Sequence, residues 1–215
     1  MLTFDSKSYL KNRWKVSQVK IDTNLKLKGQ PVDRRKFELY SHEVNAYYSH
    51  SKNQIAAQNF GTIGMVIEHE ISHGFDNRGR NYDGDGNLKQ WWSNATTDAF
   101  KTKAQCISDQ YNNFVSKSEV TGAVLGNDSS NITLCENIAD NGGLKTSDKL
   151  FYLSFAQTWC SKNTDEFLRA SFKTKYPPKR FRVTGALQNN AEFARVFQCP
   201  TESYMNPSKK CLLWE

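Results

Sequence analysis

The sequence predicts a mainly helical protein with a small β element. Several segments place apolar and aromatic residues at helical spacing, whereas only residues 44–55 carry the aromatic and β-branched residues that favour a strand. The 215 residues are enough for one domain, or for one half of a larger molecule, with a substantial core.

The amino-terminal residues 1–43 are polar and basic, with weak helical patterning. We expect them to be a lead-in, left from an upstream region, to a domain that spans residues 44–215. Within that domain, residues 44–55 should supply a strand. The helix that follows should end near Gly74, because glycine commonly stops a helix at its carboxyl end.

The segment 81–87 is rich in Asp, Gly and Asn and should form a turn. It half-resembles a calcium-binding loop, because Asp83 and Asp85 fall at ligand positions, but Trp92 stands where the essential glutamate is needed. We therefore expect no calcium site there. Further helices are expected over residues 88–114, 134–144, 151–159 and 191–197.

Composition excludes several classes of function. The net charge of +7 comes from mostly dispersed Lys and Arg residues without a nucleic-acid motif, so we expect a solvated basic surface and no nucleic-acid partner. No stretch approaches the roughly 20 apolar residues of a membrane helix, and no export signal is visible.

The cysteines and the glycosylation sequons favour an extracellular or cell-surface glycoprotein. The five cysteines lie far apart, which favours disulfides over metal ligation, and sequons begin at Asn94, Asn127 and Asn131. Because no export signal accompanies them, we expect that the chain lacks an upstream segment.

The segment 66–75 contains the spacing His-Glu-x-x-His in a stretch with helical character. Residues four apart lie one turn above each other, so His69 and His73 point to the same side, as in half of a tetrahedral zinc site. Glu70 lies about 100° further round the helix, where it can reach a water beside the metal without ligating the ion. Two surface histidines on an ordinary helix are the alternative.

A third zinc ligand is expected on another helix, because catalytic zinc usually has three protein ligands and a water. Glu136 can ligate zinc, and Asp140 shares its helical face and can accept a hydrogen bond from the free ring nitrogen of a ligand histidine. A solvated acidic helix face is the alternative, and the nearby histidine motif disfavours it. We expect one Zn²⁺ per chain.

These segments resemble the catalytic half of the neprilysin family of zinc metallopeptidases, which includes the endothelin-converting enzymes. The matching segments run in the family's order and are 44–48, 69–76, 136–144, 155–160, 181–185 and 204–211. The resemblance implies a thermolysin-like (gluzincin) catalytic domain over residues 44–215, built on two zinc-bearing helices. It also implies peptide substrates and an ectoenzyme, either secreted or anchored in the membrane with type II topology.

The resemblance also implies residue roles. The zinc ligands are His69, His73 and Glu136, the catalytic base is Glu70, the residue that orients a ligand histidine is Asp140, and the substrate-binding residues are Asn45, Ala46 and Arg182. In such a site zinc polarises the scissile carbonyl and acidifies a water. Glu70 takes the proton, which later reaches the leaving amine.

The chain departs from the family at several places. Tyr176 stands where the family has a histidine that stabilises the oxyanion, and one lost oxyanion donor typically costs about 10²–10³ in turnover. A tyrosine hydroxyl can still donate a hydrogen bond, so we expect weakened catalysis. Two segments are shorter than in the family, between Ile55 and Gly61 and after Leu144. The domain that covers the site in the family is not in this sequence.

The cysteines follow the family in part. Cys106 and Cys211 resemble an internal disulfide pair, whereas Cys160 and Cys199 resemble cysteines that pair with the covering domain. Cys135 is an extra thiol where the family usually has glycine. The departures leave a second interpretation open: a non-catalytic relative that keeps zinc for structure and binds peptides or proteins.

Overall fold

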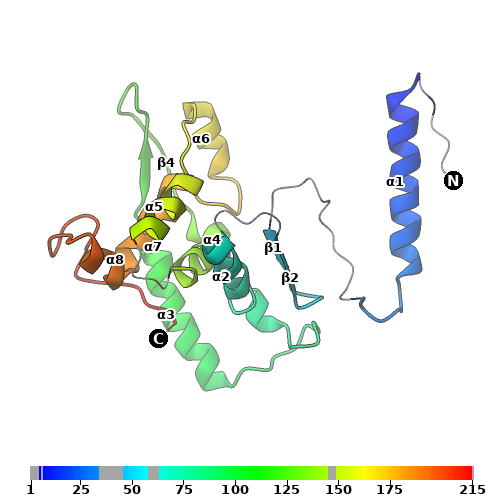
Figure 1. The fold of residues 1–215 in the computed structure, drawn as a ribbon, viewed down its shortest axis with the longest axis horizontal. Coiled ribbons are helices and arrows are strands. Elements are labelled where there is room, and N and C mark those ends of the chain that lie inside the picture. The colour runs from blue at the N-terminus through cyan, green and yellow to red at the C-terminus, as the bar shows by residue number, and fades with distance from the viewer. Residues whose placement is uncertain (1–4, 6, 34–45, 58–62, 145–148, 215) are drawn as a thin grey trace. The chain divides into compact units, whose positions relative to one another are not determined.

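The computed structural model describes residues 5, 7–33, 46–57, 63–144 and 149–214. Its contacts divide the chain into two compact units, residues 1–36 and 37–215. The described residues are mainly helical with two small sheets, which confirms the predicted fold class (Figure 1). The predicted boundary after residue 43 falls outside the described residues and stays a prediction.

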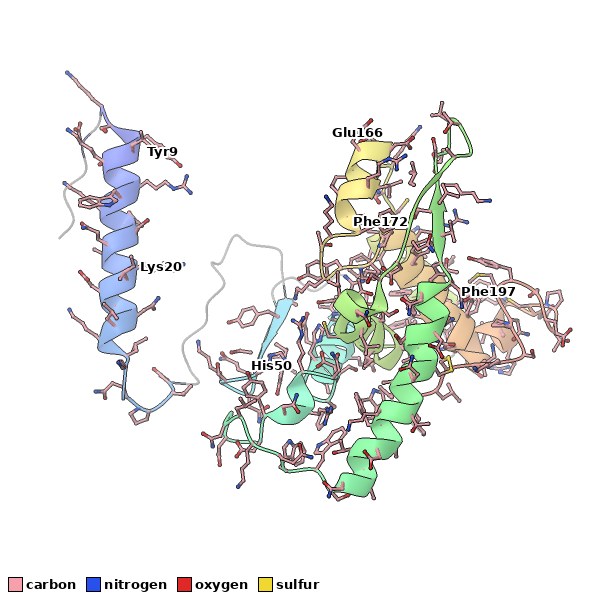
Figure 2. All side chains as sticks on the ribbon, turned by 180° about the vertical axis from the view of Figure 1, so that it is seen from behind. Tyr9, Lys20, His50, Glu166, Phe172 and Phe197 are labelled. Atoms are coloured by element: carbon pink, nitrogen blue, oxygen red, sulfur yellow. A yellow bond between two sulfur atoms is a disulfide. The ribbon has the colours of Figure 1, made fainter. Side chains whose placement is uncertain are left out.

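The described residues of the first unit contain one helix, α1 (Tyr9–Lys26), in a segment for which the sequence indicates only weak helical patterning. Ser8 caps it by accepting a hydrogen bond from the backbone N–H of Lys11 at 3.4 Å. None of its residues is buried, and Figure 2 shows side chains such as Tyr9 and Lys20 projecting from it.

The second unit begins with a hairpin and the helix that carries the histidines. The elements, in order, are β1 (Ala46–Ser49), β2 (Gln54–Ala57), α2 (Ile63–His73), the short 3₁₀ helix η1 (Gly79–Asn81), α3 (Asn94–Asn112), β3 (Val115–Lys117), β4 (Val124–Asn127), α4 (Ser130–Gly142), α5 (Lys149–Thr158), α6 (Asp165–Ser171), α7 (Lys179–Asn189) and α8 (Ala191–Val196). β1 pairs with β2, and β3 with β4, both in antiparallel orientation.

Some predicted boundaries are wrong, each for a local reason. The expected strand over residues 44–55 is a hairpin, whose turn includes Asn53 in the left-handed region at φ +46°. The helix expected from residue 88 begins at Asn94, because Ser93 is extended and its side chain accepts the Thr96 N–H at 3.1 Å.

α6, α7 and the hairpin of β3 and β4 were not predicted. α7 illustrates why: nearly all of its residues from Phe181 to Asn189 are buried, and polar residues such as Arg182 and Gln188 are among them, so its sequence has no apolar stripe to recognise. By contrast, α2, α5 and α8 lie close to their predicted positions, and the turn at residues 81–87 is present, with Gly86 at φ +80°.

Two buried clusters flank α4 and α7. One joins α3, α4, α7 and the carboxyl-terminal tail through residues such as Phe100, Ile107, Tyr111, Ile138 and Phe181. The other joins α2, α5, α7 and α8 through residues such as Met65, Tyr152, Phe155, Leu187 and Phe193. α4 therefore packs against α2, α3 and α7 at the centre of this unit.

α2 and α4 approach each other closely where Gly142 meets Ser72. A Cβ on Gly142 would overlap with Ser72 Oγ and lie 2.9 Å from Ser72 Cβ, so only glycine fits at this contact. Among the described helices, none has both the length and the hydrophobicity that a membrane span requires.

Candidate metal centre

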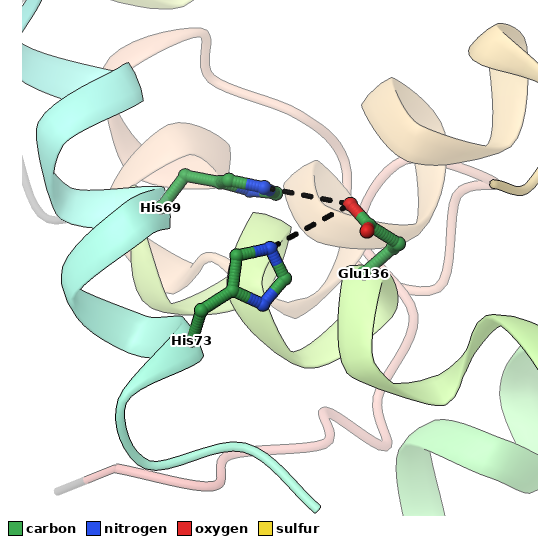
Figure 3. A group of neighbouring side chains, drawn as sticks. All are labelled: His69, His73 and Glu136. Carbon is green, nitrogen blue, oxygen red and sulfur yellow. Dashed lines mark ion pairs between the residues drawn. The ribbon is translucent and has the colours of Figure 1, made fainter. Parts of the chain in front are cut away.

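The facing sides of α2 and α4 bring His69, His73 and Glu136 together (Figure 3). Glu136 Oε2 lies 3.5 Å from His69 Nε2 and 3.8 Å from His73 Nε2. All three side chains are largely enclosed, with exposed fractions of 10%, 13% and 2% respectively. The local spacing on each helix points these groups inward, and the packing of α2 on α4 brings them to one place.

This donor set fits a zinc ion. One atom from each of the three side chains lies within 4.8 Å of the others. In a tetrahedral site with Zn–N and Zn–O bonds near 2.1 Å, ligand atoms lie about 3.4 Å apart, close to the two observed separations. His69, His73 and Glu136 could therefore hold zinc after a small contraction of the site.

Two carboxylates lie against the histidine nitrogens that face away from Glu136. His73 Nδ1 is hydrogen-bonded to Asp76 Oδ2 at 2.7 Å, and Asp76 Oδ1 accepts the backbone N–H groups of Arg78 and Gly79 at 2.7 and 2.8 Å. His69 Nδ1 lies 3.0 Å from Asp140 Oδ1, although the ring N–H does not point straight at that oxygen. Such partners set the tautomer and the orientation of ligand histidines.

Asp76 was assigned no role from the sequence. The sequence did contain an indication of its contact with His73, because Asp76 follows that residue by three positions, just after α2 ends. What the spacing could not show is that this segment turns back on the histidine, so that Asp76 is only 1% exposed.

Arg182 connects the site to α7. Its Nε and one terminal nitrogen each donate to Asp140 at 2.7 Å, and that terminal nitrogen also lies 3.3 Å from Glu136 Oε2. The guanidinium carbon lies 3.8 Å from the centre of the Trp159 ring, a stacked cation–π contact. These contacts hold both carboxylates of α4 in place. The predicted contact of Arg182 with substrate stays a prediction.

Glu70 is buried beside the histidines, at 7% exposure. Burial raises its pKa above the usual value and outweighs the opposite effect of His69 and His73, while its carboxylate accepts the backbone N–H of Tyr48. A carboxylate with a raised pKa takes up a proton more readily, as a general base must.

The charges of the site are strongly coupled. Burial disfavours the charged form of His69, but Asp140 and Glu136 outweigh it and raise the His69 pKa to about 9. Burial likewise opposes ionisation of Glu136, but His69 and Arg182 prevail and lower its pKa to about 2. In the metal-free chain His69 is therefore a cation at neutral pH, and it must lose a proton before it can ligate a metal.

The remaining predicted site residues are less closely engaged. Asn45 and the two shortened segments, between Ile55 and Gly61 and after Leu144, lie outside or partly outside the described residues. Ala46 begins β1, which packs against α2. Tyr176 is 47% exposed, and its ring centre lies 4.6 Å from Lys175 Nζ.

Lys175 was missed. Its Nζ lies 3.1 Å from Glu136 Oε1. A lysine in a basic segment gives no signal of this contact, which depends on how the chain between α6 and α7 lies against α4.

The described residues contain one disulfide and three free cysteines. Cys106 of α3 is bonded to Cys211 of the carboxyl-terminal tail, 105 residues away. Cys135 is a buried free thiol whose pKa is raised by burial, while Cys160 is exposed and Cys199 half-buried, both as free thiols.

Comparison with known proteins identifies relatives of the whole chain. The model of peptidase family M13 matches residues 43–147 and 144–213. The endothelin-converting enzyme homolog of Locusta migratoria is 38% identical in an alignment of 249 positions that covers 96% of this chain and 33% of that protein. Neprilysin of Oryctolagus cuniculus is 38% identical in an alignment of 258 positions that covers 99% of this chain and 34% of that protein.

Comparison with solved structures also identifies zinc metalloproteases. The zinc metalloprotease Zmp1 of Mycobacterium tuberculosis, solved with an inhibitor, superposes with a TM-score of 0.86 at 25% identity, covering 100% of this chain and 39% of that one. PepO of Lactobacillus rhamnosis superposes with a TM-score of 0.80 at 26% identity, covering 96% of this chain and 37% of that one. The chain spans roughly a third of the length of the curated relatives it matches.

Proposed function

The chain belongs to peptidase family M13, and on that premise we propose that it is a zinc-dependent metalloendopeptidase that hydrolyses peptide bonds within peptides. The observation that carries this proposal is the convergence of His69, His73 and Glu136 within 4.8 Å, although Glu136 follows the two histidines by more than 60 residues in the sequence. Glu70 lies beside the same histidines.

The roles of the chain's own residues follow from this geometry. A bound zinc ion would supply a Lewis acid that polarises the scissile carbonyl. Glu70 would remove a proton from the attacking water, favoured by its raised pKa, and return the proton to the leaving amine. Asp76 and Asp140 would hold the two imidazoles in register, and Arg182 would hold Asp140 and Glu136.

We propose that turnover is lower than in relatives with a histidine at the position of Tyr176. A half-exposed phenol must be ordered before it can donate to a developing oxyanion, and the loss of one such donor costs about 10²–10³ in turnover. In an assay of peptide cleavage by the zinc-loaded chain, Tyr176→His should raise kcat by tenfold or more. An unchanged or lower kcat would remove Tyr176 from the site.

We also propose an extracellular or cell-surface location. The disulfide between Cys106 and Cys211 supports an oxidising compartment, and the sequon residues Asn94, Asn127 and Asn131 are all exposed. Detection of the natural protein in the medium or at the cell surface, with a mass shift that a glycosidase removes, would test this. An unglycosylated intracellular product with reduced cysteines would contradict it.

The test of the enzymatic function uses zinc-loaded chain, a mixed peptide library and mass spectrometry. Glu70→Gln should still bind zinc, but its rate of peptide cleavage should fall about 10²–10⁴-fold, because the amide can accept no proton from water. Glu166→Gln, the same change on the exposed surface of α6, is the matched control and should cleave as the unaltered chain does.

The outcome also decides between catalysis and binding. If the unaltered chain binds zinc but cleaves no peptide in the library, the non-catalytic interpretation is correct. Equal cleavage by the Glu70→Gln variant would instead refute the role of Glu70 while leaving a peptidase.

A further inference from the structure

The segment between α6 and α7 places a lysine ammonium at the metal centre. Lys175 Nζ lies 3.1 Å from Glu136 Oε1, the carboxylate oxygen other than the one that faces the two histidines. The Lys175 side chain is 47% exposed, whereas Glu136 is 2% exposed. The ammonium is thus half-exposed to solvent while it contacts the buried carboxylate that we propose as a metal ligand.

Local structure holds this lysine in place. The N–H of Lys173 donates to the carbonyl of Ala170 at 3.2 Å, and the N–H of Thr174 donates to the carbonyl of Ser171 at 3.0 Å. Thr174 Oγ1 accepts the Tyr176 N–H at 3.3 Å and donates to the Tyr176 carbonyl at 3.1 Å. The chain on both sides of Lys175 is therefore tied into turns, and the buried Pro177 and Pro178 follow directly.

Charge around Lys175 is incompletely balanced. Residues 172–182 include five cationic side chains and no acidic one. Of these, Arg182 is compensated by its two contacts with Asp140. Among the described residues, the acidic partner of Lys175 is Glu136, which it shares with Arg182. A cation held by Glu136 would draw on the same carboxylate charge, leaving the ammonium of Lys175 a better partner for an anion.

We propose that Lys175 is a specificity-determining residue that makes this site select peptides with a carboxylate next to the bond that is cut. The inference rests on the proposed peptidase function. An ammonium–carboxylate hydrogen bond is stronger than a neutral one, and a half-exposed position tempers it to about a tenfold preference. The carboxylate can belong to an Asp or Glu side chain or to the carboxyl terminus of a short peptide.

The experiment compares kcat/KM for matched peptides with the zinc-loaded chain. One pair differs by Glu against Gln beside the scissile bond, and a second pair differs by a free acid against an amide at a nearby carboxyl terminus. The pair that shows a preference of about tenfold identifies the source of the carboxylate. Because each preference is a ratio within one protein sample, differences in zinc content between variants cancel.

Three variants assign the preference to Lys175. Lys175→Gln should reduce the ratio to near one, and Lys175→Arg should retain most of it. Lys173→Gln removes the same charge from an exposed position two residues away and should leave the ratio unchanged, which separates a local contact from general attraction of acidic peptides.

The failure of this inference differs from the failure of the proposed function. Cleavage of both members of each pair at equal rates, or a preference that survives in Lys175→Gln, overturns the role of Lys175 but leaves a peptidase. If no peptide is cleaved, the proposed function fails. Fluorescence anisotropy of labelled peptides on the same variants then decides, and equal binding of both members of each pair overturns the inference.

Discussion

At the scale of single residues, two carboxylates lie against the histidines on the side away from Glu136. Asp76 and Asp140 each lie against the Nδ1 atom of one histidine, and both are almost fully buried. The charge of a buried carboxylate must be compensated by nearby groups. Here backbone N–H groups compensate Asp76, and Arg182 compensates Asp140. We therefore expect residues outside the proposed ligand set to help orient each imidazole.

Asp76→Ala is expected to weaken zinc binding by about 10–100-fold, because His73 loses the partner that orients its ring. Competition with a chromophoric chelator at neutral pH measures the dissociation constant. Asp98→Ala is the control, since Asp98 is an exposed residue of α3 whose side chain is 75% accessible. An unchanged constant in the Asp76 variant would show that the backbone alone orients His73.

The pKa of His69 predicts how the stability of the metal-free chain depends on pH. Its folded value of about 9 lies above its ordinary value of 6.5, so the stabilisation is complete below pH 6.5 and is lost as pH rises through 9. Glu136, with its pKa lowered from 4.5 to about 2, contributes constantly in that window. Melting temperatures of chelator-treated protein should therefore fall between these two pH values.

His69→Gln supplies the comparison for this pH series. That variant lacks the titrating group and should show a flatter dependence of melting temperature on pH over the same range. If both proteins show the same slope, another group is responsible. Zinc binding at neutral pH should also release a proton from the unaltered chain.

At the scale of elements, the separation of α2 and α4 decides whether the ligands meet. A Cβ on Gly142 would overlap with Ser72 Oγ, and a Cβ on Gly143 would lie 3.1 Å from the Met65 carbonyl oxygen, so both glycines lie directly against α2. The absence of side chains at these two positions lets the backbone of α4 approach the helix that carries His69 and His73.

Gly142→Ala is expected to destabilise the chain by about 1–3 kcal/mol, because the new methyl group overlaps with Ser72 and must push the helices apart. Wider separation should also weaken zinc binding. Urea denaturation and chelator competition measure the two effects. Gly84→Ala is the control, since a Cβ there meets nothing within 4 Å; equal stability of both variants would mean that α2 and α4 adjust freely.

At the scale of the whole chain, one covalent link closes most of the second unit. The disulfide between Cys106 and Cys211 joins α3 to the carboxyl-terminal tail across 105 residues. Both cysteines contact the same buried cluster as Phe100 and Ile107. The link therefore limits the unfolded chain and also fastens the tail over the core.

Replacing both cysteines with serine should lower the free energy of unfolding by about 2–5 kcal/mol, because a long loop regains its freedom in the unfolded state. Denaturation under non-reducing conditions measures this, and Cys160→Ser, at an exposed free thiol, should change little. A double variant as stable as the unaltered chain would show that packing alone holds the tail.

The sequence by itself determined the groups that lie within one turn of a single helix. The pair His69 and His73, the pair Glu136 and Asp140, and the mainly helical class all follow from spacing, because the periodicity of a helix is a local property. The motif order of the family added the expectation that these two helices share a metal.

Only the tertiary structure decided which distant groups meet. Three contacts depend on how separate segments pack, which no local periodicity encodes. They are the hydrogen bond between Asp76 and His73, the hydrogen bond from Arg182 to Asp140, and the ion pair between Lys175 and Glu136. α7 was missed for the same reason, since its buried side includes polar residues such as Arg182 and Gln188, which local patterning reads as solvent-facing. The spacing of the proposed ligands comes from helical geometry, and the arrangement of their partners comes from the way the helices pack.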